Sequence, residues 1–285
     1  MQGDFLFFRR ERLNAGTCTG QAEGRGCACK SCTNGLQFVS MQLKLFSCNV
    51  FQREACWCLT HTPHLVDPEF IELGLHVNPS RLRERLQAKI DEEDAGDIRH
   101  DAILLLYGVC GNAAVGLTAR RTQLVIPRTH DCATVLLGGV ARYLEVFGDN
   151  PSRPFSSIGY LERCLETYRT EGGAGLEAGN TYEDFVEKYG EDNAKYIWQT
   201  LHPVYEDEPA LFIDIPETSQ ADAMARAEAR LTADGRGWSV TQGDIGMIRR
   251  LICAEWNPSE FLIVPPGATV AGVYDMNEVI RVNAP

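Results

Sequence analysis

Long apolar stretches and positive charge are both scarce in this 285-residue sequence. No apolar run comes near the ~20 residues that a helix needs to cross a bilayer. The first ten residues hold only a short apolar patch followed by two arginines, which fits a signal peptide poorly. The 27 Lys and Arg stand against 39 Asp and Glu, so the formal net charge is −12. Because binding to phosphates needs a positive field, we expect a cytoplasmic protein whose partners include no nucleic acid and no membrane.

Cysteine, by contrast, is abundant and odd in number. The sequence holds 11 cysteines, and at 285 residues with 44% hydrophobic composition it is long enough to form a packed core without disulfides. In a reducing compartment such thiols serve as metal ligands, catalytic groups or small buried residues. Their positions along the chain are therefore the first place to look for a function.

Short apolar runs alternate with helical patterns from residue 41 onward, which predicts an α/β fold with parallel sheets and flanking helices. In the first half we expect strands at residues 43–48, 70–73, 102–109 and 123–127, and helices at 79–93, 113–120 and 133–147. A repeated strand–helix order favours parallel strands with right-handed crossovers. In the doubly wound sheet that we expect, the strand order is second, first, third, fourth.

The alternation restarts after residue 154. We expect helices at 181–201, 220–233 and 245–253, and strands at 210–215, 238–241 and 261–264. The pattern favours two Rossmann-like lobes facing a cleft, at residues 41–150 and 151–285, over a single wider sheet. Residues 1–40 are rich in Cys, Gly and Thr and show no apolar periodicity, so we expect a flexible extension there.

Four soft metal ligands follow the ends of predicted parallel strands. Cys48 ends the first strand, Cys110 follows the third, and His130 and Cys132 follow the fourth. Ligand sites in such sheets lie beyond the carboxyl ends of the strands. Neighbouring strands are ~4.8 Å apart, so three strand ends fall within ~10 Å. Thiolates and imidazole suit zinc and, less uniquely, iron. The sequence therefore predicts a metal site, with zinc as the first choice.

Two other interpretations of these residues stay open. Cys110 and Cys132 each precede a predicted helix, and a helix N-terminus lowers the pKa of a thiol, so one of them could be a catalytic thiolate with His130 as base and Asp131 nearby. Alternatively, the cysteines simply pack in the core, as buried cysteines often do.

Three further residues lie where a ligand would enter. His76 ends the second predicted strand and could face the same mouth, or it could cap the next helix. Gly111 and Asn112 follow Cys110, where Asn112 could bind a ligand carboxylate or simply turn the chain. We expect all three to contribute to cofactor binding.

The N-terminal cysteines form a separate group, Cys18, Cys27, Cys29 and Cys32. Their C-x8-C-x-C-x2-C spacing is typical of neither a zinc ribbon nor a ferredoxin. An iron–sulfur cluster or a second zinc site is thus the alternative to a flexible extension that happens to contain cysteine.

Several stretches resemble a known family of unknown function, the domain-of-unknown-function family 1638. The resemblance covers about residues 43 to 275, and its most specific parts are the Cys110-Gly111-Asn112 and His130-Asp131-Cys132 elements. The matching stretches are 47–54, 74–76, 102–112, 124–132 and 261–267. Members are often encoded near corrinoid-dependent methyltransferases in anaerobic bacteria and methanogenic archaea. The resemblance implies a role in methyl or one-carbon metabolism, with a small-molecule thiol or methyl donor, or a corrinoid protein, as partner.

The predicted ligands also parallel those of zinc-dependent thiol methyltransferases, which bind zinc through a His-x-Cys pair and a distant cysteine, although on a different fold. Our leading hypothesis is a metal-binding protein whose zinc activates a thiol for methyl transfer. The alternatives are a non-enzymatic accessory protein that binds a metal or a corrinoid, and an iron–sulfur protein.

Overall fold

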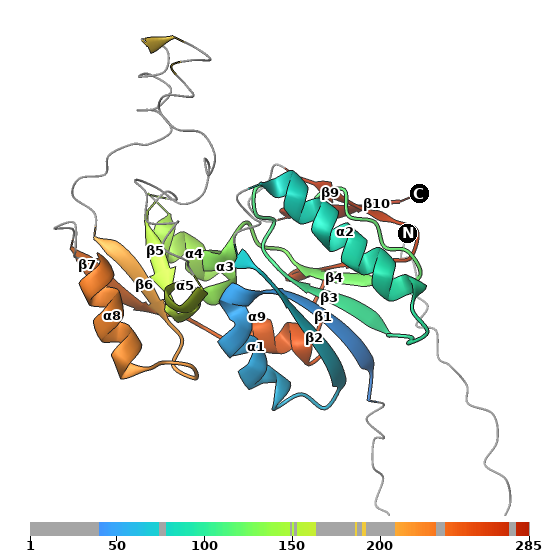
Figure 1. Ribbon diagram of the computed structural model, residues 1–285, viewed down its shortest axis with the longest axis horizontal. Helices are drawn as coiled ribbons and strands as arrows, with labels where there is room; N and C mark the ends of the chain where they lie inside the picture. Colours follow the sequence, from blue (N-terminus) through green and yellow to red (C-terminus); the bar gives the residue numbers. More distant parts are fainter. Residues whose placement is uncertain are drawn as a thin grey trace, which may run out of the picture. The chain divides into compact units, whose positions relative to one another are not determined.

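The predicted parallel sheet is present, in the predicted strand order. The computed structural model describes residues 40–73, 78–148, 150, 153–163, 186, 190–191, 209–231, 237–273 and 278–284. Five strands form the larger sheet in the order β2-β1-β3-β4-β8 (Figure 1). Their bounds are β1 (Gln42–Cys48), β2 (Leu65–Ile71), β3 (Ala102–Leu106), β4 (Leu124–Pro127) and β8 (Phe261–Val264). The first four are parallel, and β8 runs antiparallel to β4. The α/β fold class is therefore confirmed.

Burial on both faces explains why the central strands read as continuous apolar runs. Every residue of β3 and β4 is buried, as is expected for parallel strands covered on both sides. Helix α2 (Pro79–Ala95) lies on the opposite side of the strands from α1 (Gln52–Leu59) and α9 (Gly246–Ile252) (Figure 1). The start of α2 is defined by Asn78, whose side chain accepts a hydrogen bond from the Arg81 amide, and by a proline at the first turn.

A smaller parallel sheet follows in the second half of the chain. Its strands are β5 (Phe155–Ser157), β6 (Ala210–Asp214) and β7 (Trp238–Gln242), in that order, with helices α5 (Ile158–Arg163) and α8 (Ala221–Leu231). Strands β9 (Thr269–Gly272) and β10 (Ile280–Asn283) form an antiparallel pair. The existence of a cleft between two lobes and the lobe boundaries at residues 40 and 150 stay predictions.

Several elements differ from the sequence prediction, among them the strand expected at 70–73, which is found at Leu65–Ile71. The expected helix at 133–147 is two helices, α3 (Cys132–Leu136) and α4 (Val140–Phe147), because Gly138 and Gly139 between them have φ angles of 82° and 145°. The expected helix at 113–120 is replaced by turns. Strand β8, expected in the second lobe, belongs to the larger sheet. The predicted helix at 181–201 lies outside the described residues, apart from three isolated positions.

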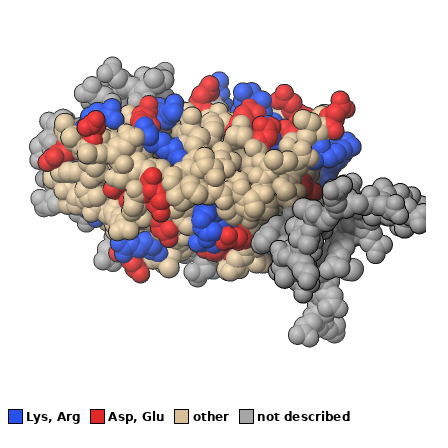
Figure 2. Space-filling view, turned by 90° about the horizontal axis from the view of Figure 1, so that it is seen from below, with Lys and Arg blue, Asp and Glu red and all other residues tan. Residues whose placement is uncertain are grey.

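The surface carries both signs of charge. On the face drawn in Figure 2, acidic and basic side chains alternate across a largely uncharged surface. In the described part of the chain, no helix has the length and apolar character that crossing a membrane requires.

Candidate thiol site

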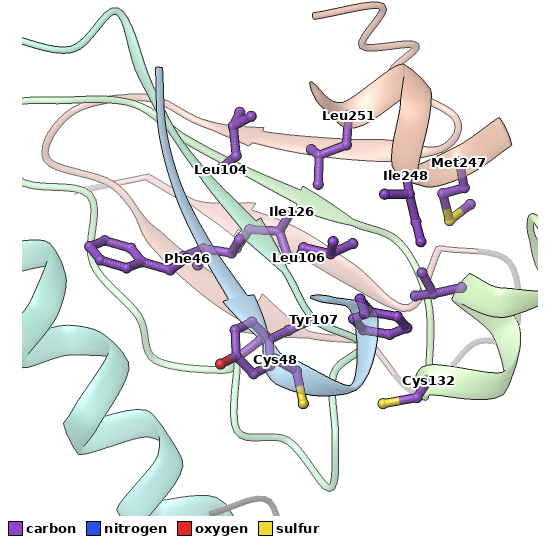
Figure 3. Packing of buried hydrophobic residues seen from close by; sticks show 14 of the residues in the cluster. Phe46, Cys48, Leu104, Leu106, Tyr107, Ile126, Cys132, Met247, Ile248 and Leu251 are labelled. Carbon is purple, nitrogen blue, oxygen red and sulfur yellow. The ribbon is translucent and has the colours of Figure 1, made fainter. Parts of the chain in front are cut away.

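Three of the four predicted ligands meet at the carboxyl end of the larger sheet. Cys48 is the last residue of β1, Cys110 lies in the loop after β3, and Cys132 opens α3 after β4. The side chains of Cys110 and Cys132 are close enough to interact, and Cys132 raises the pKa of the Cys110 thiol. The thiols of Cys132 and Cys48 are close enough to interact electrostatically, and in Figure 3 the Cys132 sulfur points toward Cys48. The topological argument from strand ends thus brings together residues that are far apart in the sequence.

The thiols of Cys48 and Cys110 are held in the protonated form. Burial, followed by the neighbouring Cys132, raises the pKa of the Cys48 thiol far above its usual value. The neighbouring Cys132 side chain, followed by burial, raises the pKa of the Cys110 thiol well above its usual value. The expected lowering by a helix N-terminus does not operate at Cys110, because turns and not a helix follow it. The arrangement therefore does not favour a free catalytic thiolate at Cys48 or Cys110.

The loop that carries Cys110 has an unusual backbone. Cys110, Gly111 and Asn112 have consecutive positive φ angles of 45°, 62° and 71°. A non-glycine residue in this region costs on the order of 1–3 kcal/mol, and such strain is often found at functional sites. Backbone hydrogen bonds hold the loop in place, from the Val109 amide to the Thr129 carbonyl (2.8 Å) and from the Cys110 amide to the His130 carbonyl (3.1 Å). Gly111 and Asn112 thus shape the turn that presents the Cys110 thiol.

Two tyrosines complete the surroundings of the thiols. Tyr107 follows β3 directly and is buried, and Tyr160 on α5 lies close enough to Cys132 for the two side chains to interact. Burial is the main reason why the pKa of each phenol is well above its usual value, and the nearby cysteines raise both pKa values further. Both phenols are therefore neutral near pH 7. Sequence reasoning missed both residues, although the position of Tyr107 directly after a buried strand was a usable signal.

Tyr160 reaches the site because α5 packs very closely on the chain after Cys48. Residues 49–51 form the one-turn 3₁₀ helix η1 (Asn49–Phe51), and a Cβ atom at Gly159 would lie 1.8 Å from the Val50 carbonyl oxygen. Only glycine permits this approach. Arg53 also binds Glu162 of α5, with its Nε 2.9 and 2.8 Å from the two carboxylate oxygens.

Buried polar atoms without a protein partner gather at the same strand ends. Tyr107, Thr129 and Ser157 are only 3%, 0% and 2% exposed. Leaving such an atom unpaired costs about 1–3 kcal/mol, so a concentration of them calls for an explanation such as ordered water or a ligand. Within the described residues, the atoms of this kind after β1, β3 and β4 are Asn49 Oδ1, Tyr107 Oη, Thr129 Oγ1 and His130 Nε2, and Ser157 Oγ at the end of β5 in the smaller sheet is another.

His130 does not complete a ligand set. Its buried Nε2 has no hydrogen-bond partner in the described part of the chain. Among the described residues, no three His, Cys, Asp or Glu side chains are placed to hold a metal ion as they stand. Asp131 is not aligned as the acid of a catalytic triad, because its Oδ1 accepts hydrogen bonds from the amide and hydroxyl of Thr134 (2.8 Å each) and so caps α3.

Five of the predicted residues fall outside the part of the chain that the structure describes, namely His76, Cys18, Cys27, Cys29 and Cys32. Cys56 is exposed. Cys58 is buried, and burial, followed by Cys253, raises the pKa of its thiol to about 12. These cysteines are useful as controls for the thiol site.

Comparison with known proteins gives one match. The family described as protein of unknown function (DUF1638) matches residues 70–252, which is more than half of the chain. No curated protein and no solved structure matches the chain.

Proposed function

The chain belongs to the DUF1638 family, and because the description of that family assigns no activity, we propose a function from the site itself: binding of one zinc ion by Cys48, Cys110 and Cys132. The observation that carries the proposal is that Cys132 interacts with both of the other thiols. Each of the three cysteines follows or ends a different strand of the larger sheet, at the edge where a ligand site of an α/β protein is expected.

The donor set is compatible with tetrahedral zinc. Zinc–sulfur bonds of about 2.3 Å would place two ligand sulfurs about 3.8 Å apart, and Cys110 and Cys132, whose side chains interact, would provide the first two ligands. Cys48 has to approach this pair, and the thiols have to lose their protons on binding. The raised pKa values of Cys48 and Cys110 mean that zinc competes with protons, so affinity should fall as pH falls.

A site with three sulfur ligands leaves the fourth zinc position for His130, for water or for a substrate. A substrate thiol in that position would have its pKa lowered by the metal, which makes it a better acceptor of a methyl group. The phenol of Tyr160 lies close to Cys132, so we expect it to orient that thiol. The neutral, buried Tyr107 and the unpaired Thr129 hydroxyl offer hydrogen-bond donors to whatever occupies the site.

The test is the metal content of the full-length chain purified without oxygen. We expect about one zinc per chain, lost in Cys132→Ser. The N-terminal cysteines could bind metal independently, so a second variant with serine at positions 18, 27, 29 and 32 must keep the zinc. The exposed Cys56→Ser serves as a matched thiol control. Undiminished zinc in Cys132→Ser, or loss only in the N-terminal variant, would refute the site.

Transfer of a methyl group distinguishes an enzyme from an accessory protein. The zinc-loaded chain is mixed with methylcobalamin and a small thiol, and the methylated thiol is measured. An enzyme forms it, and Cys132→Ser does not. A metal- or corrinoid-binding accessory protein alone forms none.

A further inference from the structure

A second concave surface lies on helix α5, away from the thiols. It is a cavity of about 800 Å³, called here the α1–α5–α8 pocket. Its walls come from the start of α1, from residues 161–163 of α5, and from residues 217–220 and 226 around the start of α8. Tyr160 points into the thiol site, while the next three residues of α5 line this pocket. The pocket is therefore separate from the candidate thiol site but is built on the same short helix.

Positive charge is concentrated in this pocket, although the chain as a whole is acidic. Arg53, Arg163 and Arg226 line it together with two carboxylates, Glu162 and Glu217. The hydrogen bond with Arg53 lowers the pKa of Glu162, and the charges of Arg163 and Arg226 lower that pKa further. All three guanidinium groups thus act on one carboxylate. Arg53 makes a two-pronged contact with Glu162, whereas Arg163 and Arg226 are exposed and interact with Glu162 through space.

Backbone dipoles add to this field. The 11-residue helix α8 begins at Ala221, directly after the pocket-lining residues 217–220, and α1 also begins with pocket-lining residues. A helix N-terminus carries partial positive charge and free amide groups, which attract anions. The segment before α8 is fixed by side-chain hydrogen bonds, from Thr218 Oγ1 to Glu54 Oε1 (2.8 Å) and from Ser219 Oγ to Asp214 Oδ2 (2.9 Å).

We infer that the α1–α5–α8 pocket binds a small molecule with two or more anionic oxygens, held by Arg163 and Arg226. Arginine pairs with phosphates and carboxylates through parallel hydrogen bonds. The cavity of about 800 Å³ suits a small organic ligand. A nucleic acid does not fit, because the chain carries a net charge of −12 and the pocket itself is lined by two carboxylates. This inference does not depend on zinc at the thiols.

The experiment is calorimetric titration of the full-length chain at low ionic strength with two probes, pyrophosphate and citrate. We expect at least one to bind with a dissociation constant below about 1 mM. Arg163→Gln combined with Arg226→Gln should weaken binding about tenfold or more. The matched control, Arg81→Gln with Arg85→Gln, changes two exposed arginines of α2 that are remote from the pocket in sequence, and it should bind as the unmodified chain does.

The two probes separate the two chemical sources of an anion. Preference for pyrophosphate points to a phosphate ligand, and preference for citrate points to a carboxylate ligand. Equal binding of the two probes means that the pocket accepts either kind of oxyanion. Absence of binding to both at about 10 mM overturns the inference. So does unchanged binding in the pocket variant, or an equal loss in the α2 control, which would indicate general surface attraction. Thermal unfolding of each variant checks that it is folded, and Arg226→Gln alone repeats the test with less change.

Discussion

Lys44 and Cys48 project from the same face of strand β1, and both are buried, but their surroundings differ in kind. Lys44 is 8% exposed and its Nζ lies 2.6 Å from Asp67 Oδ2 and 3.5 Å from Glu93 Oε2. The ion pairs continue to Glu69, which binds Lys89 at 2.9 Å. Around Cys48, by contrast, the buried polar atoms of the neighbouring strand ends have no partner among the described residues.

The difference separates a structural polar cluster from a candidate site. A buried charge that is fully paired holds elements together, here β1, β2 and α2. Buried groups left unpaired among the described residues cost stability, which points to a partner beyond those residues, either in the rest of the chain or outside it. The thiols and the strained loop at Cys110 lie together with the unpaired hydroxyls at the carboxyl end of the larger sheet. This end of the sheet is therefore the candidate site, and the Lys44 cluster is structural.

The largest change in the free energy of unfolding is expected when the ammonium group of Lys44 is removed. Lys44→Met keeps the apolar stem but leaves Asp67, Glu69 and Glu93 close together without their central cation. We expect the free energy of unfolding to fall by about 2 kcal/mol, less than for a fully buried pair because Asp67 is 58% exposed. Urea denaturation measures the change. Lys89→Met, at the outer edge of the same cluster, should lower it by about 0.5 kcal/mol or less. Equal losses of unfolding free energy in the two variants would mean that burial does not strengthen the ion pairs of Lys44.

Removal of an unpaired hydroxyl near the thiols should not lower the free energy of unfolding, in contrast to Lys44→Met. Tyr107→Phe and Thr129→Val delete buried oxygens that have no partner in the described part of the chain. Because no hydrogen bond is lost, we expect the metal-free protein to keep its stability or gain up to about 1 kcal/mol. The same urea experiment applies. A loss above about 1 kcal/mol in both variants would show that these hydroxyls are bonded to ordered water, and the contrast with Lys44 would disappear.

The course of the first four strands could be predicted from the sequence, because parallel order follows from the strand–helix alternation and its handedness. The gathering of Cys48, Cys110 and Cys132 follows from that order. Strand β8 could not be assigned this way, because its antiparallel pairing with β4 joins distant parts of the chain. The break at Gly138-Gly139 was visible in the sequence and was missed.

Tyr160 shows where sequence reasoning ends. Its place beside Cys132 depends on the packing of α5 against η1, and that packing depends on a single missing Cβ at Gly159. No periodicity or spacing reports such a contact. The left-handed turn at Cys110 could be predicted only in part. Gly111 and Asn112 are residue types that tolerate positive φ angles, but a cysteine in that conformation is not predictable from its type.

Glu54 on α1 shares one feature with Lys44 and one with the polar atoms near the thiols, because one of its carboxylate oxygens is paired and the other is not. Its substitution is expected to have the smallest effect on stability. It is 1% exposed, its Oε1 accepts a hydrogen bond from Thr218, and its Oε2 has no partner among the described residues. Burial raises the pKa of this carboxyl above 4.5, and the Thr218 hydrogen bond offsets only part of that rise. The folded state therefore binds the proton more tightly than the unfolded state. Its stability should fall as pH rises from 4.5 through the raised pKa and level off above it.

Glu54→Gln resembles the protonated acid in shape, so it should remove this dependence. We expect the variant to match the unmodified chain near pH 4.5 and to be the more stable of the two at pH 7.5. Urea denaturation of both proteins at several pH values measures the difference, and taking the difference cancels the titration of the other carboxylates. The control is Glu162→Gln, at a carboxyl whose pKa is lowered by Arg53. That variant should lose stability at neutral pH and recover it relative to the unmodified chain as pH falls. If both variants shifted in the same direction with pH, Glu54 would be ionised and paired like Lys44, with a partner for Oε2 outside the described residues.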